Sequence, residues 1–189
     1  MKIIEEKVFT SKSSATNKLE IAQYEFCEFK NIDFSRQSFS EAKFIECTFA
    51  ECDLSLINLT NCYLQDVKFK NCKMLGLHFD TCSDFLFEVN FWNCKLDNSS
   101  FFQKNMKKAQ FLNCNLESVD FTEADLSASN FERSNLLQAM FENTILEKTD
   151  FSAALNFSIN LQINKVNKAI FSKKNLEGLL NHLPIILID

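Results

Sequence analysis

The sequence has very few of the residues that interrupt regular structure. Its 189 residues include only two glycines and one proline. Because no stretch rich in these residues divides the chain, we expect one domain rather than two domains joined by a linker. Gly76 and Gly178 stand far apart, which excludes a glycine-rich phosphate loop. No cofactor is therefore expected.

Long hydrophobic runs are also missing. The opening segment MKIIEEKVFTSK carries acidic residues among its apolar ones, which argues against a signal peptide or a membrane span. We expect a cytoplasmic protein without membrane contact. The two histidines, His78 and His182, have no cysteine, serine or acid at a catalytic spacing, so we do not expect an enzyme.

Phenylalanine is abundant, and it recurs with a period of five. Phe supplies 21 of the 24 aromatic residues. From Tyr24 to Phe79 every fifth residue is apolar, and after one slip the pattern resumes at Phe91 and runs to Leu176 with Asn156 as its only polar member. We call these places the repeat positions. A helix repeats at about 3.6 residues and a strand at 2, so a period of five requires a turn after each short extended stretch. Repeating one bend winds the chain into a solenoid.

The cysteines follow the same period. Each lies two residues before a repeat position, with Cys82 at the slip as the loosest case: Cys27, Cys47, Cys52, Cys62, Cys72, Cys82, Cys94 and Cys114. Ala, Val, Ser or Thr fill this small position elsewhere, so cysteine is expected there as a buried, free, small hydrophobe. A disulfide framework does not fit a reducing compartment, and a metal site would need more convergent ligands than stacked pairs supply.

Stretches such as VDFTE, ADLSA, SNFER and SNLLQ resemble the pentapeptide-repeat family, whose motif is A(D/N)LXX. The resemblance covers residues 19–176. It implies an all-β fold, a right-handed quadrilateral β-helix in which four pentapeptides make one turn and residues twenty apart stack. The solenoid is expected to end in a short C-terminal helix and strand.

Both ends of such a rod need a cap. We expect an N-terminal cap at residues 1–18, the repeats at 19–176 and a C-terminal cap and dimerisation segment at 177–189. The leucines near the end recur with helical spacing, with Asn175 as the expected N-cap and Pro184 as the stop. The apolar run after Pro184 is expected to form a strand, and a twofold dimer would cover it. The expected interface comprises Leu176, Leu179, Leu180, Leu183, Ile185, Ile186 and Leu187.

Two irregularities interrupt the period. Between Phe79 and Phe91 twelve residues replace ten, a slip at residues 80–90 that is either a bulge lengthening a corner or a contact loop. Asn156 either points inward and bonds to backbone or marks a small bulge. The sequence leaves both choices open.

Acidic residues concentrate between Glu117 and Asp150, although the net charge is only −5. An acidic rod could present carboxylates where DNA presents phosphates, and so occupy the DNA-binding groove of a protein without itself contacting nucleic acid. The expected partner-binding acidic face comprises Asp97, Glu117, Asp120, Asp125, Glu142, Glu147 and Asp150.

The pattern FxxC and the ending FSKKNLEGLLNHLPIILID are similar to those of the quinolone-resistance pentapeptide proteins and their mycobacterial relatives. That resemblance implies a dimeric, non-enzymatic DNA mimic that binds a type II topoisomerase, DNA gyrase or topoisomerase IV. It implies an effect on the enzyme's activity or on its fluoroquinolone sensitivity. A rigid cytosolic scaffold for an unrelated partner is the alternative, and an active site at the slip, around Asp84 and Glu88, is the third.

Overall fold

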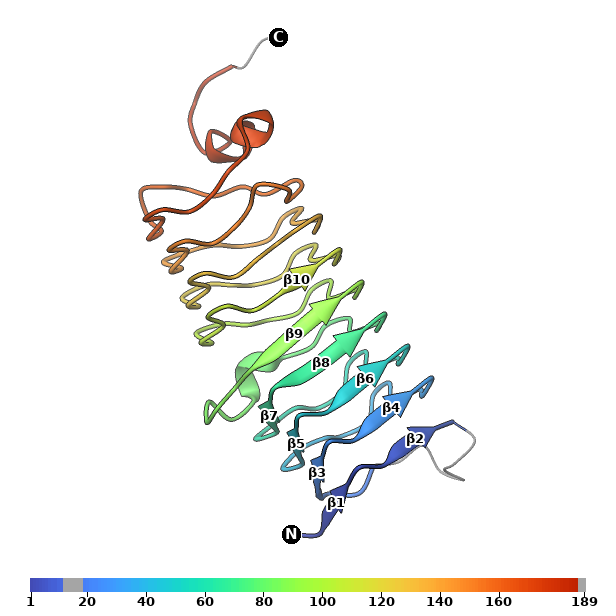
Figure 1. The fold of residues 1–189 in the computed structure, drawn as a ribbon. Helices are drawn as coiled ribbons and strands as arrows, with labels where there is room; N and C mark the ends of the chain where they lie inside the picture. The colour runs from blue at the N-terminus through green and yellow to red at the C-terminus, as the bar shows by residue number, and fades with distance from the viewer. Residues whose placement is uncertain (12–18, 187–189) are drawn as a thin grey trace.

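A computed structural model describes residues 1–11 and 19–186 of the chain. It shows a rod in which the chain coils around one long axis, with the termini at opposite ends (Figure 1). All strand pairs are parallel and form two sheets. One sheet has the order β1 (Ile3–Glu5), β3 (Gln23–Glu25), β5 (Lys43–Ile45) and β7 (Tyr63–Gln65). The other has the order β2 (Val8–Thr10), β4 (Glu28–Lys30), β6 (Thr48–Ala50), β8 (Val67–Lys70), β9 (Val89–Trp92) and β10 (Phe111–Leu112).

The rod has four faces, which we number in chain order within a coil. Face 1 carries the sheet of β1, β3, β5 and β7, and face 2 carries the sheet from β2 to β10. Faces 3 and 4 are held by single β-bridges, for example Lys95 to Asn115 on face 3 and Ser100 to Asp120 on face 4. Partners are twenty residues apart, except across the slip, where Val67 pairs with Val89. The expected stacking of a four-sided β-solenoid is confirmed.

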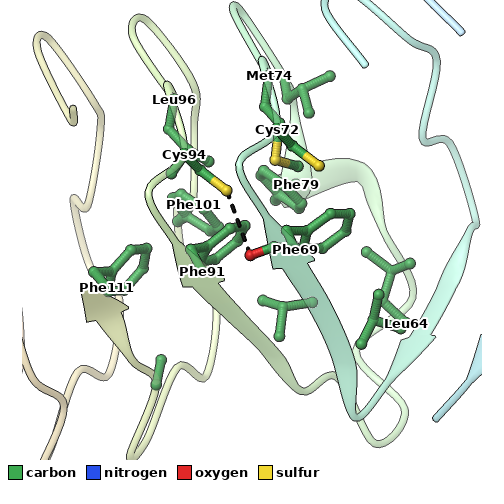
Figure 2. Packing of buried hydrophobic residues seen from close by; sticks show 14 of the residues in the cluster. Leu64, Phe69, Cys72, Met74, Phe79, Phe91, Cys94, Leu96, Phe101 and Phe111 are labelled. Carbon is green, nitrogen blue, oxygen red and sulfur yellow. Dashed lines mark hydrogen bonds between the residues drawn. The ribbon is translucent and has the colours of Figure 1, made fainter. Parts of the chain in front are cut away.

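The repeat positions fill the interior of the rod (Figure 2). Phe111 lies between its neighbours along face 2, with its ring centroid 4.9 Å from that of Phe131 at an interplanar angle of 2°. It meets Phe121 of face 4 edge-on, with centroids 5.6 Å apart and an angle of 81°. Both arrangements suit the quadrupole of aromatic rings, and each fully buried ring contributes about 1.5–3 kcal/mol through burial. One side-chain shape therefore repeats because one site repeats.

Each corner of the coil is turned by a residue in the left-handed region. In nearly every pentapeptide the second residue after the repeat position has a φ between 45° and 63°. Asn31, Asn71 and Asn93 tolerate this conformation well, whereas Phe26 and Leu56 adopt it against their steric preference. This residue bends the extended stretch and so sets the period of five.

The small positions hold hydrogen-bond donors as well as small hydrophobes. The Sγ of Cys94 donates to the carbonyl of Phe69 in the preceding coil, over 3.4 Å (Figure 2). Ser134 donates equivalently to Phe111 over 2.7 Å, and Thr144 to Phe121 over 2.9 Å. The expectation of buried free thiols agrees with the structure, but treating cysteine only as a hydrophobe missed this role as a donor.

The slip is a two-residue enlargement of one corner of face 1. A 3₁₀ turn, η1 (Phe79–Thr81), precedes it, and Cys82 stays buried at its small position. Phe85 and Leu86 then stand exposed at the tip, and β9 resumes the regular pairing with β8. Asn156 also marks a bulge: it is exposed, has a φ of 56°, and the next residue, Phe157, enters the core instead. The alternative of an inward Asn156 was wrong.

The first coil begins ahead of the expected boundary at residue 19, because β1 and β2 already pair with β3 and β4. At the other end, the helical spacing gives the 3₁₀ segment η2 (Lys173–Leu179), with a kink at Asn175. The expected N-cap was wrong: Ser172 is the cap, and Asn175 instead donates to the carbonyls of Phe151 and Ala154.

The segment after Pro184 was expected to be a strand. Ile185 and Ile186 do not lie in a strand, and Leu187 falls outside the described residues.

Candidate functional site

Face 4 is an acidic surface of the rod. No lysine or arginine occupies an outward position of face 4 between Ser38 and Ile163, all of which the structure describes. They carry five acids: Glu41, Asp80, Asp120, Glu123 and Glu142. Because an exposed carboxylate without a nearby cation keeps its full field, this face gives the rod a negative side.

The acids are densest on the two adjoining faces 3 and 4. Asp97 and Glu117 lie on face 3 in neighbouring coils, and Asp120, Glu123 and Glu142 continue the cluster on face 4. We call these five residues the acidic cluster. Asp120 is fixed because its Oδ1 accepts from the backbone N–H of Thr122 over 2.8 Å.

The acidic cluster is ordered by amide side chains. Gln103 donates to Glu123 over 2.7 Å, and Asn115 donates to the carboxylate of Asp97. The amide of Asn135 continues this row by donating to Asn115 over 2.7 Å. These neutral donors orient the carboxylates without cancelling their charge.

The structure therefore brings together four of the seven acids in the expected face: Asp97, Glu117, Asp120 and Glu142. The other three do not join them. Asp125 and Glu147 lie on face 1, and Asp150 lies on face 2, which is across the rod from face 4. The sequence window grouped them because consecutive pentapeptides occupy different faces. Glu123 was missing from the expected set, and its place twenty residues after Gln103 is the signal that adds it.

Face 1 differs from face 4 because lysines lie among its acids. The carboxylate of Asp125 lies 3.2 Å from the Nζ of Lys107, and Lys148 follows Glu147 in the same coil. Burial disfavours the charged form of Asp125, but hydrogen bonds from Ser127 and the ion pair with Lys107 outweigh it, so its pKa is lowered.

A buried lysine in the coil after the slip contacts it, and the sequence reasoning missed this residue. Lys104 occupies the small position two residues before Met106 and is only 3% exposed. Its Nζ lies 2.6 Å from the carbonyl of Cys82, 2.6 Å from the Oδ1 of Asp84 and 5.2 Å from the ring centroid of Phe87. A lysine in a row of small residues is the signal that could have found it. The enlarged corner is thus held from inside by one cation.

The described part of the chain offers few groups for metal binding or catalysis. It contains no group of three His, Cys, Asp or Glu side chains placed to hold a metal ion. His78 Nδ1 lies 3.3 Å from Asp80 Oδ1 on face 4, and His182 is exposed. Beside Glu88 the corner encloses a cavity of only about 20 Å³. Burial raises the pKa of the Cys47 and Cys82 thiols to about 12, which keeps them protonated and unreactive.

The expected dimer residues lie at the C-terminal end of the rod. Leu176, Leu183, Ile185 and Ile186 are exposed, whereas Leu179 and Leu180 are half-buried. Gly178 fits against the last coil, because a Cβ there would stand 2.3 Å from the carbonyl oxygen of Phe157. Among the described residues, no helix has the length and apolar character that crossing a membrane requires.

Comparison with known proteins agrees with this architecture. Residues 22–85 match the family model described as a pentapeptide repeat region, and residues 86–122 and 120–155 match the model described as pentapeptide repeats in eight copies. No curated protein matches the chain.

Solved structures of QnrB1, a plasmid-mediated fluoroquinolone resistance protein, are similar in fold. A trypsin-treated variant is 16% identical with a TM-score of 0.58, and the match covers 100% of this chain and 99% of that one. Full-length QnrB1 is 14% identical with a TM-score of 0.50, covering 97% of this chain and 100% of that one. At these identities the likeness concerns the fold alone.

Proposed function

Because the chain belongs to the pentapeptide-repeat family, we propose that it acts by binding rather than by catalysis. Its partner in this proposal is a type II topoisomerase, DNA gyrase or topoisomerase IV. The protein imitates DNA and thereby changes the enzyme's activity or its sensitivity to fluoroquinolones. The observation that carries the proposal is the acidic face 4, together with the acidic cluster that continues from it onto face 3.

The spacing of the carboxylates supports this proposal. Neighbouring parallel strands lie about 4.8 Å apart, so Asp97 and Glu117, which occupy equivalent positions in neighbouring coils, repeat at that interval. Duplex DNA carries one charge per about 3.4 Å of axis on each strand. The acids of face 4 occupy different positions within their coils, so a groove that binds DNA would meet negative charges spread along one side of a rigid scaffold. QnrB1, whose fold is similar, is a plasmid-mediated fluoroquinolone resistance protein.

The proposed assembly is a homodimer joined at the C-terminal ends, and the proposed location is the cytoplasm. The exposed apolar residues Leu176, Leu183, Ile185 and Ile186 support this assembly, because burying them against a second copy would remove them from water. A dimer would also double the length of the acidic face.

A supercoiling assay with purified gyrase, with and without a fluoroquinolone, tests the function. We expect the wild-type protein to change supercoiling or the drug's effect at micromolar concentration. The triple variant Asp120→Asn, Glu123→Gln, Glu142→Gln should lose most of this effect. No effect of the wild type at tens of micromolar would contradict the proposal.

A matched control removes three acids from face 2 instead: Glu51→Gln, Glu132→Gln and Asp150→Asn. The control and the test variant also match in local structure. Asp150 accepts a hydrogen bond from the N–H of Ser152 over 2.8 Å, and Asp120 accepts the same bond from Thr122. Both triple variants change the net charge equally. Equal losses in the two variants would mean that total charge, not face 4, governs the effect.

A further inference from the structure

The only tryptophan of the chain lies outside the core. Trp92 is half-buried on the outer side of β9, whereas its neighbour Phe91 points inward and is fully buried. Along this row of face 2 the preceding strands carry Lys30, Ala50 and Lys70. An indole on this surface is not needed to fill the rod.

A surface hollow of about 520 Å³ lies beside the indole. Its lining consists of Lys68, Lys70, Asn71, Trp92 and Asn93. Lys70 is the direct cross-strand partner of Trp92, and the N–H of Asn71 donates to the Trp92 carbonyl over 2.8 Å. The two asparagines occupy successive left-handed corners, each with a φ of 53°. An aromatic plane, cations and amide groups thus meet at one place on a rigid sheet.

The cations around this hollow are only partly neutralised. Lys68 lies 3.2 Å from Asp66, and Lys73 lies 2.9 Å from Asp53. Lys70, and Lys95 just beyond Asn93, form no ion pair with any of the described residues. Glu51 lies one coil before Asn71 at this corner between faces 2 and 3, so the region carries both signs of charge, with the lysines in excess.

We propose that this surface, the Trp92 platform, binds a nucleobase with its phosphate. The base stacks on the indole, Lys70 contacts the phosphate, and the amides of Asn71 and Asn93 contact the edge of the base. Exposed aromatic rings between lysines bind single-stranded nucleic acid in this way, and stacking is independent of base identity. The same chemistry occurs in a free nucleotide. Because the hollow is shallow and buries little of a small ligand, we expect a single strand, which also reaches Lys95, to bind more tightly.

The Trp92 platform lies apart from the acidic face 4, and base binding there is independent of the proposed function. Binding at this surface would differ from the expectation, based on the acidic residues, that the protein contacts no nucleic acid. Face 2 gives a reason to test that expectation directly.

The single tryptophan makes the test specific, because its fluorescence reports on this surface alone. Titration with AMP and with a ten-residue oligo(dA) should quench Trp92 emission, with the oligonucleotide acting at lower concentration and more weakly as salt rises. Quenching by the oligonucleotide alone identifies a single-strand site, and equal affinity for AMP identifies a nucleotide site. Absence of quenching by both probes at millimolar concentration would overturn the proposal.

Variants separate the platform from nonspecific charge. With a labelled oligo(dA) followed by anisotropy, Trp92→Ala should weaken binding about tenfold or more, and Trp92→Phe should retain most of it. Lys70→Gln should weaken binding several-fold. Lys30→Gln is the matched control, because Lys30 occupies the same row on β4 but pairs with Glu28 at 2.8 Å and has no tryptophan beside it. Binding that is unchanged in Trp92→Ala and Lys70→Gln would contradict the assignment.

Discussion

Ser134→Ala tests whether the small positions act as hydrogen-bond donors between coils. The hydroxyl of Ser134 is fully buried, donates to the Phe111 carbonyl over 2.7 Å and accepts from the Cys114 N–H over 2.9 Å. Alanine fits the space but removes both bonds inside the rod. A buried polar group that loses its partner costs about 1–3 kcal/mol, so we expect a loss of about 2–4 kcal/mol in the free energy of unfolding. At an m-value of about 2 kcal/mol per molar urea, the midpoint falls by about 1–2 M.

Equilibrium urea unfolding followed by circular dichroism measures this loss. Ser134→Cys should lose less than Ser134→Ala, because the neighbouring thiols of Cys72 and Cys94 make the same bond to a carbonyl at 3.4 Å. Ser152→Ala is the control, since Ser152 is exposed and should change stability by less than about 0.5 kcal/mol. If Ser134→Ala is as stable as this control, small volume alone explains the position and the donor role is refuted.

Three further predictions concern the enlarged corner, the C-terminal segment and acid stability. Lys104→Met should cost about 1–3 kcal/mol in urea unfolding, because the Cys82 carbonyl loses its donor, and should speed hydrogen exchange at residues 83–88; unchanged exchange there would show that Lys104 does not hold the corner. Gly178→Ala should detach the 3₁₀ segment, because the new Cβ meets a carbonyl oxygen, and should speed exchange of the Ile159 amide, which donates to Gly178 over 2.9 Å. Protection equal to wild type would contradict that. The lowered pKa of Asp125 stabilises the fold above its unfolded pKa of about 3.9, and this contribution is lost as the pH falls through the folded value. Unfolding of Asp125→Asn should therefore be less sensitive to acid below about pH 4 than that of the wild type, and an identical acid dependence would refute the assignment.

The interior of the rod was predictable because one rule generates it. A period of five places Phe69, Phe91 and Phe111 in one stack, and the two-residue slip between the first two is visible as a change of spacing. The cysteines are predictable as buried for the same reason. Their full arrangement is less obvious: Cys52, Cys72, Cys94 and Cys114 form one continuous row, because the slip shifts the register by two between Cys72 and Cys94.

The surface was harder to predict, because neighbours in sequence separate in space. Glu117 and Asp120 lie on adjoining faces, whereas Asp125 is carried to face 1 and Asp150 to face 2. Residues whose numbers differ by a multiple of twenty share a face once the two-residue slip is taken into account. Grouping the acids by this rule would have assigned them to their separate faces.

The ends and irregular corners follow no repeat rule. Asn175 is a residue type that often caps helices, but its side chain donates to carbonyls of the last coil. The local sequence does not encode this tertiary contact. Lys104 breaks the rule of small residues, and its partner Asp84 comes from the preceding coil.

Binding of the protein to purified gyrase in the presence of increasing linear duplex DNA tests the central claim most directly. If face 4 takes the place of DNA, the two ligands exclude each other, and the apparent Kd of the protein rises in proportion to the DNA concentration. Raising the salt concentration should weaken both interactions. Binding that is unaffected by saturating DNA, or the formation of a ternary complex, would contradict DNA mimicry.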